Sequence, residues 1–258
     1  MPLNIQTRDL TPQQAMVIGF SIIILSGAIL LLLPISSASG KSIGWRNTLF
    51  TATSAVSLTG LTVVDIAPNL SLFGQAVILI LVKLGGLGFM LFGVMLALLL
   101  GKRITLKDRL LIQEATRAFS IQGMVKLVMY IVCISFLLEG LVAIILGFYW
   151  SPTLGWKQAT YKAIFHAISA FNNSGLSLYP NSLQAYVGDP VVNLCITSLS
   201  IIGGIGFTVL LDVYSNRSWK KLSLHTRIVL LTSGILMLTA FILILAIECF
   251  NPQTFKHL

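Results

Sequence analysis

A polar, glycine-containing segment occurs twice in this chain, each time between stretches that are apolar enough to lie in a membrane. Residues 53–61 read Thr-Ser-Ala-Val-Ser-Leu-Thr-Gly-Leu, and residues 168–176 read Ile-Ser-Ala-Phe-Asn-Asn-Ser-Gly-Leu. Two further matches follow in the same order, a Gly-Gly-x-Gly-Phe sequence and a basic segment: 85–89 with 203–207, and 103–109 with 221–227. Three matches in one order indicate an internal repeat, and a repeated polar break between apolar segments predicts an ion path.

The composition places the chain in a lipid bilayer. Of the 258 residues, 56% are hydrophobic and 10% are charged, which leaves too little polar surface to cover a soluble protein of this size. A helical crossing needs about 20 apolar residues. The sequence therefore predicts an all-α polytopic membrane protein. Five segments are long and apolar enough to cross: 16–33, 73–100, 124–148, 190–214 and 226–250.

Two shorter apolar segments, 45–56 and 156–171, lie at the polar breaks. A helix rises about 1.5 Å per residue, so a dozen residues cover about 18 Å of a hydrocarbon core about 30 Å thick. Each is predicted to enter the membrane as a pore helix, and the polar segment after it to return to the same side as an extended filter loop. Repeated modules of span, pore helix, filter loop and span then divide the chain. The predicted modules are residues 1–122, residues 123–224, and residues 225–258 as the first span of an incomplete third module.

Most of the 17 Lys and Arg residues fall on one side of the predicted topology. The loops 102–109 and 217–227 are strongly basic, and basic loops tend to stay in the cytoplasm. We therefore expect a multi-pass protein of the cytoplasmic membrane with its amino terminus inside and both hairpins entering from outside. This topology explains the net charge of +9, so no nucleic acid is expected as a partner. Membrane lipid phosphates and a soluble regulatory partner are candidates for contact with the basic loops.

The two filter loops are predicted to bind a cation through backbone oxygens. A pore helix that enters from outside places the negative end of its dipole near the bilayer centre. Carbonyl oxygens can replace the hydration shell of a potassium-like ion, and the loops contain no Asp or Glu that would trap it. Hydroxyl and amide side chains are expected to tie each loop to its pore helix; the alternative is an ordinary extracellular turn that caps a buried helix. The predicted ion-binding residues are Ser57, Leu58, Thr59, Gly60, Asn172, Asn173, Ser174 and Gly175.

Two groups of glycines are predicted to pack helices closely against the hairpins. They lie inside apolar spans and do not complete the Gly-x-Gly-x-x-Gly pattern of a phosphate loop, because Leu91 and Val209 occupy the third position. The glycines are Gly85, Gly86 and Gly88 in the first repeat and Gly203, Gly204 and Gly206 in the second.

Two charged residues lie well inside predicted spans, away from the span ends. Lys83 is the one basic residue at such a depth, and Glu139 lies in the middle of the third span. Charges at membrane depth are costly and need water or a partner. Lys83 and Glu139 are therefore candidates for electrostatic tuning of the ion path, and each is a candidate partner for the other.

The residues of both breaks resemble the Trk/Ktr/HKT superfamily of potassium transporters, in particular the Ktr membrane subunit. The resemblance rests on residues 56–61, residues 166–175 and the two Gly-Gly-x-Gly-Phe sequences, and it covers essentially the whole chain. It implies modules arranged around one central pathway, with Gly60 and Gly175 as filter glycines and glycine at the first position associated with potassium passage. It also implies a homodimer, a cytoplasmic nucleotide-binding regulatory ring, and uptake that is often sodium-dependent.

The sequence thus predicts the ion-translocating subunit of a potassium uptake system rather than an enzyme. It carries K⁺ as the transported ion, with Na⁺ as a candidate coupling ion and no covalently bound cofactor. The third and fourth repeats of the resembled family are absent, so one alternative is a truncated, non-conducting fragment that inserts and at most associates with full-length subunits. A remote alternative is an intramembrane hydrolase that uses His166, Ser169 and Asp189.

Overall fold

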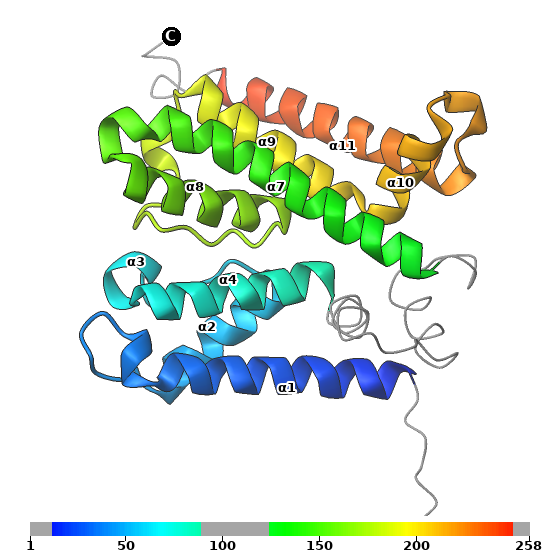
Figure 1. The fold of residues 1–258 in the computed structure, drawn as a ribbon. Helices are drawn as coiled ribbons and strands as arrows, with labels where there is room; N and C mark the ends of the chain where they lie inside the picture. Colours follow the sequence, from blue (N-terminus) through cyan, green and yellow to red (C-terminus); the bar gives the residue numbers. More distant parts are fainter. Residues whose placement is uncertain (1–11, 89–123, 250–258) are drawn as a thin grey trace, which may run out of the picture. The chain divides into compact units, whose positions relative to one another are not determined.

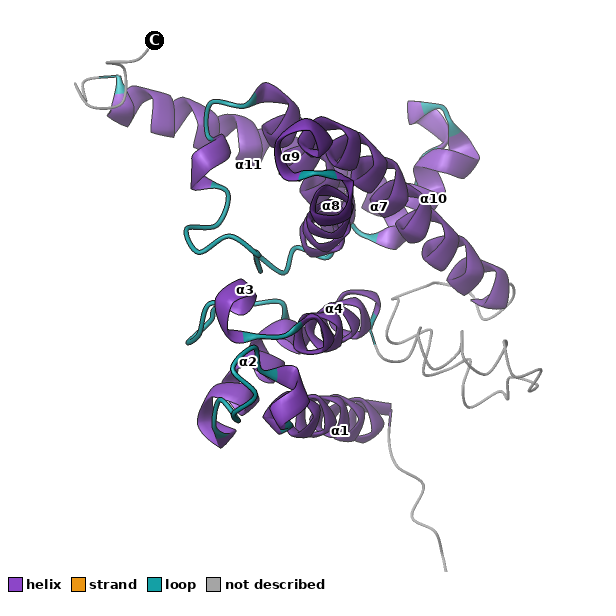
Figure 2. Cartoon of the chain, turned by 60° about the vertical axis from the view of Figure 1, so that its left-hand side comes forward, coloured by secondary structure: helices purple, strands orange, loops and turns teal. Residues whose placement is uncertain are grey.

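The computed structural model describes residues 12–88 and 124–249, and these residues form helices and loops with no strand among them (Figure 2). The expectation of an all-helical chain with apolar helices is confirmed for this part of the sequence. The chain divides into two compact units, Met1–Gly204 and Ile205–Leu258.

The first unit contains one order of elements twice: a long helix, a short helix, a loop and another helix (Figure 1). The first set ends in the teal helix α4, and the second begins in the green helix α7. The first set comprises α1 (Pro12–Leu32), a 3₁₀ turn at Pro34–Ser36, α2 (Trp45–Ser57), the short α3 (Ile66–Asn69) and α4 (Leu72–Leu87). The second set comprises α7 (Met124–Leu154), α8 (Trp156–Phe171), a 3₁₀ turn at Gln184–Tyr186 and α9 (Pro190–Ile205).

The second unit contains α10 (Phe207–Asn216), a 3₁₀ turn at Trp219–Lys221 and α11 (Leu224–Glu248). Asp212 of α10 accepts hydrogen bonds from the backbone N–H and the hydroxyl of Ser223, at 2.9 and 2.8 Å. Ser223 in turn caps α11 by accepting a bond from the Thr226 N–H. These contacts fix the turn between the two helices of this unit.

The first unit contains two apolar cores, and the one around α2 also includes Phe165, Leu176 and Leu178 of the second set. In the first set, Ala52 and Ala55 of α2 are fully buried, and their small side chains let α2 lie close to α1 and α4. Ala28, Leu31, Ile78 and Val82 complete the centre of this core. In the second set, Ala159 and Ala163 give α8 the same kind of surface, and it packs against α7 around Leu146, Trp150 and Val192.

The predicted spans are only partly continuous helices. Among the described residues, Met129–Leu154 and Leu224–Glu248 are long and apolar enough to cross a membrane, and α9 with α10 meets the same test as an interrupted pair. Met16–Leu32 and α4 are apolar but shorter. The segment 190–214, predicted as one crossing, contains an interruption, because Gly206 (φ 99°) separates α9 from α10.

The equivalent glycine in the first repeat ends α4. Gly88 has φ 76° and follows Leu87, the last residue of α4, whereas residues 89–100 of the segment expected over 73–100 lie outside the described residues. A side chain disfavours positive φ, which explains why a glycine stands at the end of α4 and between α9 and α10. Among the described residues, no atom lies within 4 Å of a Cβ placed on Gly88 or Gly206, so close packing at these two positions stays a prediction.

The first glycine of each group lies against the end of a short helix. A Cβ on Gly85 would collide with the carbonyl oxygen of Val56 in the last turn of α2, and a Cβ on Gly203 would collide with that of Phe171, the last residue of α8. Helix α4 therefore approaches α2, and α9 approaches α8, at a distance that only glycine allows.

Replacing Gly203 by alanine should destabilise the protein because the new methyl group meets backbone that cannot move aside. We expect a loss of about 1–3 kcal/mol, measured as a lower melting temperature of the purified protein in detergent. The control is Gly140→Ala in α7, where no described atom lies within 4 Å of the added Cβ. That variant should be neutral or slightly more stable, and equal melting temperatures for both variants would contradict the packing argument.

Candidate functional site

The two polar loops meet at their glycines. Gly60 and Gly175 have φ of 73° and 69°, a region that side chains disfavour. A Cβ placed on Gly60 would lie 2.7 Å from the Ser174 carbonyl oxygen and 3.1 Å from the Gly175 Cα. The first loop (residues 57–61) and the second loop (residues 172–176) therefore lie side by side, at a separation that excludes a side chain.

The loops adopt the same backbone conformation at equivalent positions. Leu58 and Asn173 both have positive φ, 58° and 54°, two residues before the glycines. The Thr59 N–H donates to the Ser54 carbonyl at 3.1 Å, and the Ser174 N–H donates to the Ser169 carbonyl at 2.9 Å. Each loop therefore leaves the short helix before it through the same turn.

Hydroxyl groups hold each loop to the helix before it. Thr59 donates to the Ser54 hydroxyl at 3.0 Å, and the Ser174 and Ser169 hydroxyls are 2.9 Å apart. Among the described residues, no N–H or O–H group donates to the carbonyl oxygens at 58–60 or 173–175. With respect to the described donors, these oxygens keep the capacity to accept from or coordinate another group, as carbonyl oxygens do with cations.

The remaining predicted residues have different surroundings. Ser57 is the last residue of α2, and its hydroxyl donates to the Thr53 carbonyl within that helix at 2.7 Å. Asn173 donates to the Ser200 carbonyl of α9 at 3.2 Å, so it ties the second loop to α9 rather than to α8 as expected. Asn172 does bond to its own helix, at the Ile168 carbonyl, 2.8 Å away.

Lys83 and Glu139 form a buried ion pair. The Lys83 Nζ lies 2.5 Å from the Glu139 Oε1, and the two side chains come from α4 and α7. The Lys83 ammonium also donates to the Ser135 hydroxyl at 2.9 Å, and Asn172 donates to the same Glu139 oxygen at 3.1 Å. The pairing of Lys83 with Glu139 that the sequence suggested is present. The hydrogen bond to Ser135 could not be predicted, because serines are common in apolar helices.

The structure does not assemble the hydrolase triad. The two ring nitrogens of His166 contact the Lys162 carbonyl at 2.7 Å and the Ser177 hydroxyl at 3.1 Å. The hydroxyl of Ser169 instead donates to the Leu176 carbonyl at 2.6 Å. Asp189 caps α9 through the Val191 N–H at 2.9 Å. A nucleophile needs a hydrogen-bonded base, and His166 does not contact Ser169 in this way.

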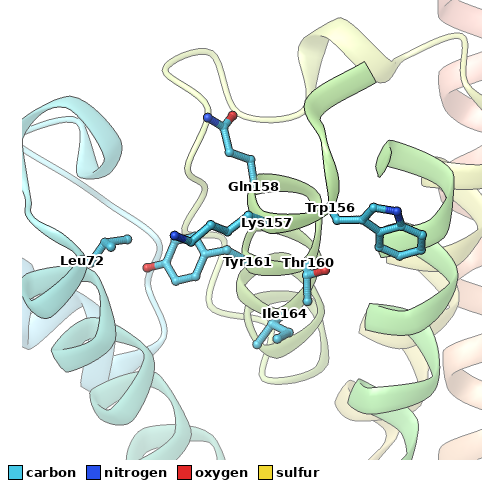
Figure 3. Close-up of a pocket in the computed structure, with 7 residues that line it drawn as sticks. All are labelled: Leu72, Trp156, Lys157, Gln158, Thr160, Tyr161 and Ile164. Atoms are coloured by element: carbon cyan, nitrogen blue, oxygen red, sulfur yellow. The ribbon is translucent and has the colours of Figure 1, made fainter. Parts of the chain in front are cut away.

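A separate pocket of about 750 Å³ lies against one face of the short helix α8 (Figure 3). Tyr161, one of its lining residues, donates to Gln75 of α4 at 2.8 Å. Its lining is largely apolar and includes no residue of either loop, so it is distinct from the candidate ion site. The lining residues are Leu72 of α4 and Trp156, Lys157, Gln158, Thr160, Tyr161 and Ile164 of α8.

Comparison with known proteins identifies relatives among cation transporters. The family TrkH, described as cation transport protein, matches residues 4–255. The chain is 49% identical over 252 residues to Ktr system potassium uptake protein B of Bacillus subtilis (strain 168), covering 96% of this chain and 55% of that protein. Identity is 38% to Ktr system potassium uptake protein B of Vibrio alginolyticus and 36% to potassium/sodium uptake protein NtpJ of Enterococcus hirae, each covering 93% of this chain and 53% of the relative. The chain spans about half the length of these relatives.

Two matched variants distinguish the energetic cost of the contact between the loops from the cost of backbone strain at positive φ. Gly40 has φ 69°, close to that of Gly60, but no described atom lies within 4 Å of a Cβ built there. Gly40→Ala should cost about 1–2 kcal/mol from backbone strain alone. Gly60→Ala should cost clearly more, because its methyl group also meets the Ser174 carbonyl. Melting temperatures of the purified variants test this, and equal losses would show that the loops do not touch.

Proposed function

This chain belongs to the TrkH family of cation transport proteins, and from that premise we propose that it forms the ion-translocating part of a potassium uptake subunit in the cytoplasmic membrane. The observation that carries the proposal is the meeting of two loops of equal conformation at Gly60 and Gly175. The names of the relatives from B. subtilis and V. alginolyticus, both potassium uptake proteins, support potassium as the ion. The name of NtpJ includes sodium, which supports Na⁺ as a coupling ion.

The proposed ion ligands are the backbone carbonyl oxygens of residues 57–60 and 172–175. Several carbonyls together replace the hydration shell of K⁺, and none binds it as tightly as a carboxylate would. The hydroxyls of Thr59 and Ser174 already bond to the short helices, so the side chains fix the backbone rather than bind the ion. The membrane potential drives entry with about 2.3 kcal/mol per unit charge for each 100 mV.

The proposed architecture consists of two modules and the first span of a third: residues 1–122, 123–224 and 225–258. Helices α2 and α8 are the proposed pore helices, and the 57–61 and 172–176 loops are the proposed filter loops. Gly85 and Gly203 let the second span of each module pack against the end of its pore helix. The resemblance further supports a homodimer, a cytoplasmic nucleotide-binding ring as partner, and an amino terminus in the cytoplasm.

Replacing Gly60 by serine should weaken the discrimination of K⁺ from Na⁺. The serine side chain would meet the Ser174 carbonyl and shift the oxygens that replace the hydration shell. Uptake in a bacterial strain that lacks its own potassium uptake systems measures the effect, with an expected fall in the K⁺/Na⁺ uptake ratio of roughly tenfold, or about 1.4 kcal/mol.

Gly40→Ser is the matched control, since it adds the same side chain at a similar φ without a close contact. The control should keep the selectivity of the unmodified protein. Unchanged selectivity in Gly60→Ser would contradict the filter assignment, and absence of uptake by the unmodified protein would favour the non-conducting alternative.

The proposed orientation predicts which side of the membrane two exposed serines face. Ser42 precedes α2 and should lie outside, whereas Ser218 lies between α10 and α11 and should lie in the cytoplasm. In a background in which Cys133, Cys195 and Cys249 are replaced, Ser42→Cys should react with a membrane-impermeant maleimide on intact cells. Ser218→Cys should react only after permeabilisation. The reverse pattern would place both hairpins on the cytoplasmic side and refute the topology.

A further inference from the structure

The buried ion pair connects the two sets of helices with the start of the second loop. Lys83 comes from α4 in the first set, Glu139 from α7 in the second, and Asn172 is the residue that follows α8. One oxygen, the Glu139 Oε1, accepts from the Lys83 ammonium at 2.5 Å and from the Asn172 amide at 3.1 Å. The charge pair and the loop therefore share a single acceptor.

The position of Asn172 depends on this acceptor. Its amide nitrogen has two acceptors, the Ile168 carbonyl and the Glu139 carboxylate, whereas its Oδ1 is buried and has no donor among the described residues. The opposite side of the amide rests on the backbone of α4 at Gly86, where an added Cβ would lie 2.6 Å from the Asn172 Cγ. Glu139 on one side and Gly86 on the other thus hold the first residue of the second loop.

The described residues around the pair leave little of either side chain exposed. Lys83 is 9% exposed and Glu139 is 3% exposed. The Lys83 ammonium lies 4.5 Å from the centre of the Phe136 ring and 5.5 Å from that of Phe171, the residue directly before Asn172. A single buried charge is costly, so each member of the pair keeps the other in place. As a pair they add no net charge beside a cation path.

We propose that the Lys83–Glu139 pair positions the second loop for ion selection. Glu139 orients Asn172, and Lys83 compensates the charge of Glu139 and fixes its carboxylate. Neither residue binds the ion; both act through Asn172, and the first module thereby controls the geometry of the filter loop in the second. This inference rests on the proposed function of the loops as an ion filter.

Single substitutions cannot test the proposal cleanly, because Glu139→Gln alone leaves the buried Lys83 unpaired and endangers folding. Two charge-free double variants avoid this problem. Lys83→Met with Glu139→Gln keeps an oxygen that accepts from Asn172, whereas Lys83→Met with Glu139→Leu removes it. Of the two, only the Gln variant has an oxygen at residue 139 that can accept the hydrogen bond from Asn172; its amide also carries an NH₂ group that can donate. Ser135→Ala is the control, since Ser135 contacts Lys83 but not Asn172.

The first readout is amide hydrogen exchange of the purified protein, which does not depend on transport. With Leu at position 139, the amides of residues 172–176 should exchange about fivefold faster than with Gln, because one hydrogen bond that orders the loop is missing. The amides of α1 serve as an internal reference and should not change, since that helix contributes neither to the pair nor to the second loop. Ser135→Ala should leave both loops unchanged.

The second readout is the K⁺/Na⁺ uptake ratio, which should be about threefold or more lower in the Leu variant than in the Gln variant, because only Gln keeps an acceptor for Asn172. If the pair served only as a structural anchor, both double variants would show the same exchange and the same selectivity, and the proposal would be overturned. If the exchange differs as expected while the unmodified protein takes up no K⁺, the positioning role stands and the transport function fails.

Discussion

The arrangement depends on the requirement that backbone polar groups at membrane depth be satisfied or covered. An extended loop in a bilayer is stable only where protein or water surrounds it. Each loop meets this requirement in the same way: one N–H and one hydroxyl return to the preceding short helix, as Thr59 does to Ser54 and Ser174 to Ser169. The carbonyl oxygens of the same turns are the proposed cation ligands, so the stability of the loop and its proposed binding capacity have one origin.

The helices around the loops follow from that geometry. A loop must be covered closely, and the first glycine of each Gly-Gly-x-Gly-Phe sequence lets the next helix touch the carbonyl end of the short helix. The second glycine has a different neighbour in the two repeats. Gly86 contacts Asn172, which belongs to the other set of helices, whereas Gly204 lies near Asn173 of its own set. The contact at Gly86 and the Lys83–Glu139 pair together connect the two sets behind the second loop.

Much of this could be predicted from the sequence, because apolar length and repeated motifs report directly on helices and their order. The bounds expected for the second short helix, 156–171, are those observed, and the first differs only by Ser57. The end of α4 at Gly88 and the interruption between α9 and α10 at Gly206 were missed, because hydropathy does not report a positive φ inside an apolar run. The bond from Asn173 to Ser200 was also missed, since a long-range partner leaves no local pattern. The ion pair could be suspected only because charges are rare within spans.

The contact between the two glycines also limits which substitutions these two positions can accept. A side chain at either position would occupy space next to the other backbone, so changes at Gly60 and Gly175 cannot be independent in their energetic effect. A substitution accepted at one position alters the room left at its counterpart, although the two are far apart along the chain. The two loops share one conformation, and the crowding where they meet couples the two positions energetically.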